Sequence, residues 1–208
     1  MDGVFFMKSV LKFIFVSLLA VVCAGILLLA KEKQKITDGV IRLHVVGASN
    51  SEIDQAVKLE VRDAVLETVS RLTEGASCKE ETQKILADNL DVIQSAADGK
   101  LSQLGCEEQT VISLCEEKFS TRHYDTFSLP AGVYDSLRIT IGPGEGRNWW
   151  CVVFPSFCVS ATSDEFRDKA VAAGLTEESA MALAGDYEIR FFLLDCMGAV
   201  ENFLFDLQ

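Results

Sequence analysis

The stretch from Ile41 to Leu72 constrains the fold most, because it joins a strand pattern to a helix pattern through a short polar elbow. Residues 41–46 form an apolar run, and Gly47 is followed by small polar residues. From Ser51 onward, apolar side chains recur at three- and four-residue steps, the spacing of one helix face. Ser51 and Asp54 suit a helix start, since a hydroxyl can accept from a free amide and a carboxylate is favourable in the first turn. The sequence therefore predicts a strand, an elbow and a long helix as the first tertiary unit.

The N-terminal part of the chain is typical of an export signal. An apolar run of 18 residues, Phe13–Ala30, follows two lysines. It is longer than most signal-peptide cores and barely spans a bilayer, so cleavage and retention as an anchor both stay open. We expect residues 1–35 to be a signal peptide or membrane anchor and residues 36–208 to form one extracytoplasmic domain. We also hypothesise that translation starts at Met7 rather than Met1, because the segment from Met7 is the better signal n-region.

The charge of the remaining chain excludes one class of partner. After residues 1–35, 14 basic and 29 acidic residues remain, a net charge of −15. Such a surface repels phosphate backbones, so we expect no nucleic-acid binding. Solubility of an exported domain is the simplest explanation of this acidity.

Six cysteines follow the leader: Cys78, Cys106, Cys115, Cys151, Cys158 and Cys196. An oxidising compartment could pair them in many ways, whereas isolated buried thiols are the simpler interpretation for most of them. Cys151 and Cys158 could form a disulfide if the chain reverses at Pro155. No CxxC spacing occurs, and we expect neither a metal site nor a cofactor.

The middle of the chain changes from a helical to a strand period. A second long amphipathic helix is expected from a capping box at Ser77 and Glu80 to Gly105. Two adjacent strands are expected at 111–114 and 124–129, with a short helical turn at 133–137. Two further strands, 138–141 and 149–154, are interpreted as a pair joined by a flexible hairpin loop at 142–148. That glycine-rich loop opens a strand, not a helix, so it does not match a nucleotide-binding loop.

The C-terminal part is helical in pattern. Short helices are expected at 164–173 and 176–184. A closing amphipathic helix is indicated by the spacing of Ile189, Phe192, Met197, Val200, Phe203 and Leu207. Residues 188–194 alone could instead be a buried strand. Taken together, the patterns predict an α+β domain with an antiparallel or mixed sheet, packed by two long helices and C-terminal helices.

Two blocks of this sequence resemble the stage II sporulation protein R family. The first reads Ile41-Arg42-Leu43-His44-Val45, followed by matching positions at 54–58 and 61–65. The second runs from Leu129-Pro130-Ala131-Gly132 through Asn148-Trp149-Trp150-Cys151-Val152 to Phe154-Pro155. Ser156 and Phe157 depart from the proline and leucine expected in the family.

The resemblance implies an exported intercellular signal of sporulation, located between the forespore and mother-cell membranes. Its implied partner is a membrane-embedded aspartic protease of the mother cell, which cuts the precursor of sigma factor E. The cutting carboxylates would then belong to the partner. We accordingly expect neither catalytic residues nor a small-molecule substrate in this chain.

Eight residues are candidates for contacting the partner: Arg42, His44, Asn50, Asp54, Lys58, Arg62, Trp149 and Trp150. On a strand, the two tryptophan rings face opposite sides, so one can fill the core while the other anchors a protein partner or a membrane interface. Burial of both rings is the alternative. The polar residues could form one patch at the elbow, or Asp54, Lys58 and Arg62 could simply pair along a solvated helix face.

Two rival functions stay open. A Cys-His hydrolase would use Cys151 or Cys158 with one of the two histidines, His44 and His123. His44, which alternates with Arg42 on the predicted strand, is more typical of a hydrogen-bonded structural histidine. The other rival is a structural domain of the cell envelope.

Overall fold

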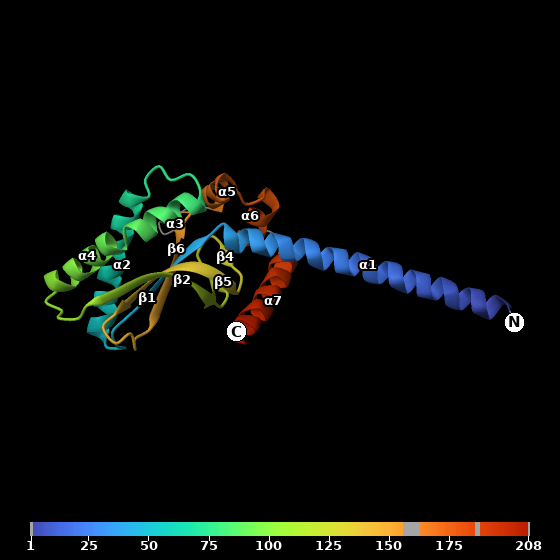
Figure 1. Cartoon of the computed structure of the whole chain (residues 1–208), viewed down its shortest axis with the longest axis horizontal. Helices are drawn as coiled ribbons and strands as arrows, with labels where there is room; N and C mark the ends of the chain where they lie inside the picture. Colours follow the sequence, from blue (N-terminus) through green and yellow to red (C-terminus); the bar gives the residue numbers. More distant parts are fainter. Residues whose placement is uncertain (1, 156–162, 186–187, 208) are drawn as a thin grey trace.

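A four-stranded mixed sheet separates two layers of helices (Figure 1). The computed structural model describes residues 2–155, 163–185 and 188–207. The elements in chain order are α1 (Asp2–Asp38), β1 (Ile41–Val46), α2 (Glu52–Leu72), α3 (Lys79–Asp88), α4 (Leu90–Gln103), β2 (Thr110–Phe119), β3 (Arg122–His123), β4 (Ser128–Leu129), β5 (Gly132–Ile141), β6 (Asn148–Phe154), α5 (Ser163–Ala172), α6 (Glu177–Leu183) and α7 (Glu188–Phe205). The predicted α+β class, with an apolar N-terminal helix and a mixed sheet, is confirmed.

The strand order is β2-β5-β1-β6, with β1 parallel to β5 and antiparallel to β6. The predicted hairpin of residues 138–141 and 149–154 is therefore wrong, because β1 lies between these two strands. Residues 133–137 belong to β5 and do not form a helical turn. β1 and β2 pair with β5 on its two sides and so satisfy its backbone hydrogen-bonding groups. This pairing favours an extended strand over a local helical turn.

The two strands expected to be adjacent at 111–114 and 124–129 are also placed differently. The first is part of β2, which pairs with β5. The second contributes only β4, which pairs with β3 in a separate two-stranded sheet. Sequence neighbourhood was a poor guide here, because the sheet takes its partners from distant parts of the chain.

The helix expected from Ser77 to Gly105 divides into α3 and α4 at Asn89, whose amide Nδ2 donates to the carbonyl of Ile85 (2.7 Å). Its start also differs, since Cys78 is the N-cap and Ser77 binds the carboxylate of Glu81 instead of pairing with Glu80. The apolar stripe nevertheless continues across the break.

Each face of the sheet has its own core. On one face, α2, α3 and α4 cover β-strand residues such as Leu43 and Ile139 with the buried side chains of Val61, Val65, Leu86, Ile93, Ala97 and Leu101. On the other face, α1 and α5 to α7 cover Phe119, Tyr134 and Val152 with Ile36, Phe166, Leu183 and Leu194. We call these the α2–α4 layer and the α1/α5–α7 layer.

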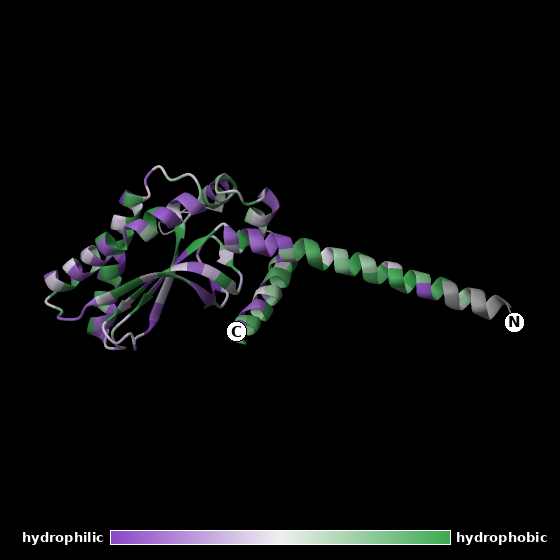
Figure 2. Cartoon of the chain, in the orientation of Figure 1, coloured by the Kyte–Doolittle hydropathy of each residue, from purple (hydrophilic) through white to green (hydrophobic). Residues whose placement is uncertain are grey.

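Helix α1 extends far beyond the rest of the molecule, and its outer part is strongly apolar (Figures 1 and 2). Its segment Val10–Asp38 is the one candidate in the described chain that is long and apolar enough to cross a bilayer, a criterion that a signal sequence also meets. The last turn of α1 belongs to the folded domain, where Ile36 is fully buried.

Helix α7 confirms the predicted closing helix and rules out a strand at 188–194. The orientation is unexpected, because most of the apolar residues that predicted it are exposed, among them Ile189, Phe192, Val200 and Phe203. Different residues of α7, such as Leu194, face the core.

Candidate functional site

The elbow between β1 and α2 is a closed network of hydrogen bonds. Ser51 caps α2 as predicted, since its Oγ accepts from the amide of Asp54 (3.0 Å). The carboxylate of Asp54 accepts from the hydroxyl of Ser49. The side-chain amide of Gln55 donates to the carbonyl of Ser49 (2.7 Å). The elbow is therefore held by its own side chains before any other segment contacts it.

The loop at 142–148 lies directly on this elbow. The amide of Gly146 donates to the carbonyl of Gly47 (2.8 Å), and the amide of Arg147 donates to Oδ1 of Asn50 (2.8 Å). A Cβ at Gly146 would lie 2.3 Å from the carbonyl oxygen of Ser49, so glycine allows this approach. The loop connects β5 to β6 across the end of β1, and these contacts tie it down, unlike the flexible hairpin loop that was predicted.

Lys58 fastens the same loop. Its Nζ donates to the carbonyl of Arg147 (2.9 Å) and to Oε1 of Gln55 (2.7 Å). The residue is only 4% exposed. Burial lowers the pKa of Lys58, and the nearby charges of Arg147 and Arg62 lower it further. Lys58 thus helps to build the elbow, and of the two alternatives left open by the sequence, pairing of Lys58 with Asp54 and Arg62 on a solvated face is the one that the structure excludes.

Arg62 and Trp149 lie half-buried beside the elbow. The guanidinium carbon of Arg62 lies 4.5 Å from the centre of the Trp149 ring. Trp149 is half-buried and packs against the core of the α2–α4 layer. Such a cation–π pair presents a flat, partly desolvated surface, which suits contact with another protein.

Arg42 lies on the opposite face of the sheet and is fully buried. Its guanidinium carbon lies 4.0 Å from the ring centre of Phe119 and 5.0 Å from that of Tyr134. One terminal nitrogen donates to the hydroxyl of Tyr124 (3.0 Å), while Nε and the other terminal nitrogen have no hydrogen-bond partner among the described residues. Arg42 is therefore separated from the other polar residues of the predicted elbow patch.

His44 belongs to a second polar group on that face, together with Glu117 and Arg138. Its Nδ1 lies 3.1 and 3.2 Å from the two carboxylate oxygens of Glu117 and must donate, because a carboxylate only accepts. Arg138 donates to the same carboxylate (2.9 Å). Burial acts to raise the pKa of Glu117, but the hydrogen bond from His44 and the neighbouring positive charges outweigh it, so the net pKa is lowered.

The Trp150 ring packs against the group formed by His44, Glu117 and Arg138. The His44 ring stacks on Trp150 with 5.7 Å between ring centres, and the guanidinium of Arg122 lies 3.5 Å from the Trp150 ring centre. Trp149 and Trp150 face opposite sides of β6, as predicted, and each is half-buried under an arginine. Glu117, Arg138 and Arg122 were missed, since their role depends on strand pairing that the sequence did not reveal.

The positions of the cysteines and histidines can be compared with what a Cys-His hydrolase would need. Cys151 pairs with Leu43 in the register of β1 and β6, so it shares the face of Leu43 and points away from His44. His123 binds the hydroxyl of Ser128 (2.8 Å). Cys158 lies outside the described residues, so the Cys151–Cys158 disulfide stays a prediction.

The other five cysteines are Cys23, Cys78, Cys106, Cys115 and Cys196, and all are free thiols. Of the six cysteines after the leader, Cys78, Cys106, Cys115 and Cys196 are not buried, which corrects the expectation of buried thiols for most of the six. Within the described chain, no group of three His, Cys, Asp or Glu residues could hold a metal ion.

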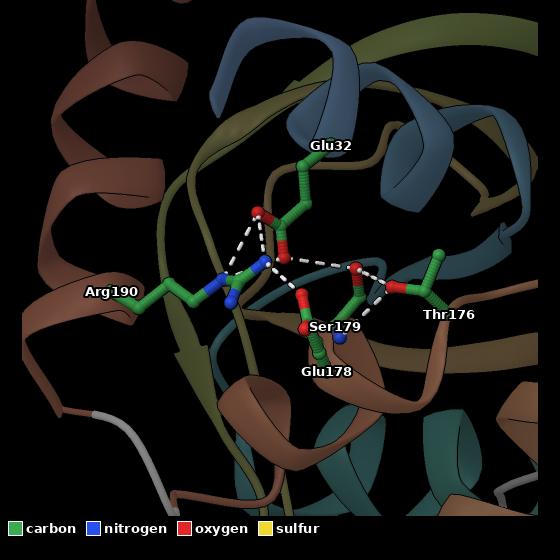
Figure 3. Close-up of polar contacts among 5 residues, drawn as sticks. All are labelled: Glu32, Thr176, Glu178, Ser179 and Arg190. Carbon is green, nitrogen blue, oxygen red and sulfur yellow. Dashed lines mark hydrogen bonds and ion pairs between the residues drawn. The ribbon is translucent and has the colours of Figure 1, made fainter. Parts of the chain in front are cut away.

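A polar junction joins α1, α6 and α7, and it too was missed (Figure 3). Arg190 donates from Nε and a terminal nitrogen to both oxygens of Glu32, at 2.8–3.0 Å. Glu32 also accepts from Ser179 (2.9 Å), and Arg190 reaches Glu178 (3.1 Å). The only sequence signal was an isolated acid among the lysines that follow the apolar run.

These features define a class: an α+β domain attached to an apolar N-terminal helix, with polar groups that serve mainly to hold its segments together. Residues 37–164 match the stage II sporulation protein R family, and the chain belongs to that family. The match contains the whole four-stranded sheet and α2 to α4, and it leaves α6, α7 and most of α1 outside.

A relative supports the same assignment. The chain is 31% identical over 148 residues to the stage II sporulation protein R of Bacillus subtilis (strain 168). The alignment covers 69% of this chain and 66% of that protein. No solved structure matches the chain.

Proposed function

We propose that this protein is an exported signal of sporulation that activates a membrane-embedded aspartic protease of the mother cell and so leads to processing of the sigma factor E precursor. Membership of the stage II sporulation protein R family supports the sporulation role and is the observation that carries the proposal. The apolar part of α1 supports export, as a signal sequence or an anchor. The domain would then act in the space between the forespore and mother-cell membranes.

Activation follows from differential binding. A ligand shifts a conformational equilibrium only if it binds one state more tightly than the other. The domain therefore binds the active arrangement of the protease more tightly than the inactive one. No bond-breaking group of this chain is needed for that effect.

The exposure of the eight candidate residues shows which of them are accessible to a partner protein. Asn50 is exposed although its Oδ1 accepts from the amide of Arg147, and Arg62, Trp149 and Trp150 are partly exposed, so these four are the proposed contact residues. Asp54 and His44 are engaged by Ser49 and Glu117, respectively, and contribute by position. Arg42 and Lys58 are buried and act by holding the strand and the elbow in place.

Co-expression of this chain with the protease and the sigma precursor in a non-sporulating host tests the proposal. We expect the precursor to be shortened only when all three proteins are present and the protease is intact. An unchanged precursor would remove the proposal. Precursor cleavage without the protease would favour a hydrolase instead.

A matched pair of variants tests the contact surface in the same assay. Arg62 and Arg71 both lie on α2, but only Arg62 stacks on Trp149. We expect Arg62→Ala to reduce processing and Arg71→Ala to leave it unchanged at equal protein levels. Equal activity of the two variants would remove Arg62 from the contact surface without affecting the proposed signalling role.

A further inference from the structure

Helix α7 carries a continuous apolar stripe on the side that faces away from the domain. The stripe consists of Ile189, Phe192, Leu193, Cys196, Val200, Phe203, Leu204 and, just past the helix end, Leu207. These residues recur at three-, four- and seven-residue steps and so lie along one side of the helix. The side chains other than Cys196 are 41–80% exposed, and Cys196 is also exposed. No charged or hydrogen-bonding residue interrupts the stripe.

The opposite side of α7 is fixed to the domain. Leu194 is fully buried, and the side-chain amide of Asn202 donates to the carbonyl of Phe119 (2.8 Å). A carboxylate oxygen of Asp195 accepts from the amide of Ala131 (2.8 Å). A Cβ at Gly198 would clash with the carbonyl of Ala131, so glycine allows α7 to pack directly against this backbone. The helix cannot roll to bury its stripe without breaking these contacts.

The stripe begins where the apolar surface of α1 ends. Arg190 and Glu201 of α7 pair with Glu32 and Lys33, the first polar turn after the apolar run of α1. The side chains of that run, from Phe13 to Leu28, are largely exposed. Figures 1 and 2 show that α1 leaves the domain at the end where α7 lies, and that these two helices carry most of the apolar ribbon there.

We propose that the exposed stripe of α7 lies in the boundary between the headgroups and the acyl chains of the bilayer that α1 enters. Continuity with α1 is the argument for lipid, because a bilayer around the apolar run would meet α7 at the polar turn that ends it. An unbroken apolar side opposite a polar side is what an interfacial helix requires. The proposal rests on α1 lying in the membrane and does not depend on protease activation.

The charges of α7 predict which lipids suffice. The helix contains no lysine, and its one arginine is occupied by Glu32 and Glu178. Attraction of α7 itself to anionic headgroups therefore contributes little, and apolar area supplies the affinity of the stripe. Neutral phosphatidylcholine should be enough.

Binding of the stripe would also fix the orientation of the domain. With α1 and α7 both in the membrane, the domain has two contacts and cannot rotate freely about α1. The edge of the sheet and the elbow would then be held at a set height above the lipid. If the leader were cut within its apolar run, α7 would still hold the domain to the surface.

Three native cysteines allow a direct depth measurement in the full-length chain. Cys23 lies in the apolar run of α1, Cys196 in the stripe, and Cys78 at the exposed start of α3. Each is kept in turn and given a nitroxide label, while the other four free cysteines are changed to serine. A variant with all five changed gives the background. The chains are reconstituted in phosphatidylcholine vesicles, and the label is probed with oxygen, which concentrates in lipid, and with a water-soluble nickel chelate.

We expect Cys23 to be accessible to oxygen, Cys78 to nickel, and Cys196 to oxygen near the headgroups. Adding phosphatidylglycerol should not change the order. If the Cys196 label is as accessible to the nickel chelate as the Cys78 label while the Cys23 label is in lipid, the proposal for α7 is wrong. The role of α1 as an anchor would not be affected. Cys23 in water would remove both. Spin–spin broadening between Cys196 labels would instead indicate that a second copy covers the stripe, and would also overturn it.

Two matched variants complete the test. Val200 lies in the stripe, and Val171 is an exposed valine on α5, away from it. We expect Val200→Asp to move the Cys196 label toward the nickel-accessible phase, since a charge is costly at the apolar boundary, and Val171→Asp to leave it in place. Equal behaviour of the two variants would contradict insertion of the stripe.

Discussion

The two helical layers of this domain solve the same packing problem differently. The α2–α4 layer covers its face of the sheet with an almost entirely apolar core. The α1/α5–α7 layer covers a buried arginine of β1, Arg42. Its helices are held together by charged pairs such as Glu32 with Arg190. It also exposes the apolar stripe of α7. The first layer is held to the sheet mainly by apolar packing, whereas the second also exposes the apolar stripe that we propose lies in the membrane.

The family match follows this division. Residues 37–164 include the sheet and the α2–α4 layer, while most of α1 and all of α6 and α7 fall outside. The matched part therefore contains the whole core of the α2–α4 layer together with the strand residues of the opposite face, Arg42 among them. The two layers therefore differ in what they leave exposed, since α7 of the second layer carries an uncovered apolar stripe.

Leu43 tests the first layer and should show the largest effect. It is fully buried against the α2–α4 layer, so Leu43→Ala should lower the free energy of unfolding by about 2–5 kcal/mol through lost burial and a cavity. Urea unfolding of the full chain in detergent micelles measures this loss. A loss smaller than that of Arg42→Ala would reverse the ranking of the two layers.

Arg42 is the neighbour of Leu43 on the opposite face. We expect Arg42→Ala to cost roughly 2–4 kcal/mol, because it removes packing between Phe119 and Tyr134 and the cation–π contacts. Arg42→Met should cost less, since it fills the space without burying a charge. Equal losses for the two variants would assign the stabilisation to the guanidinium rather than to its volume.

Arg190 tests the fastening of the second layer. Arg190→Ala leaves the carboxylate of Glu32 without its main partner, and we expect a loss of about 1–2 kcal/mol confined to α7 and its neighbours. Hydrogen exchange should speed up in α7 and stay unchanged in α2 and α4. Faster exchange in all three helices would mean that the two layers unfold as one unit.

Glu117 gives the smallest effect, and its sign depends on pH. A lowered folded-state pKa stabilises the domain above the ordinary value of 4.5, and this contribution is lost as the pH falls through the folded value. At neutral pH, the free energy of unfolding of the wild type should exceed that of Glu117→Gln by a few tenths to about 1 kcal/mol. This gap should close on acidification. Glu116→Gln, at an exposed neighbouring position, is the control. A gap that widens in acid would contradict the assignment.

Local patterns predicted the local structure well. The capped start of α2 at Ser51 follows from contacts within a few residues, and the opposite orientation of Trp149 and Trp150 follows from strand geometry. The sheet order could not be predicted, because β1 inserts between β5 and β6 through pairing across about a hundred residues. The His44–Glu117–Arg138 group depends on that pairing, so it was out of reach as well.

The stripe of α7 shows a second limit of such patterns. The same spacing that buries Ile93, Ala97 and Leu101 in α4 leaves Phe192, Val200 and Phe203 exposed in α7. Periodicity reports that a helix has an apolar side, and it does not report what covers that side. In α7 the opposite side binds the domain, so the apolar side is left exposed.

The side of the membrane on which the domain lies is the most direct test of the whole account. Cys78 is an exposed free thiol at the start of α3, so a membrane-impermeant maleimide can report its position in intact protoplasts of an expressing host. In a full chain whose other four free cysteines are changed to serine, the account predicts labelling before lysis and its loss when Cys78→Ser is added. Labelling that occurs only after lysis would place the domain in the cytoplasm and contradict an exported signal.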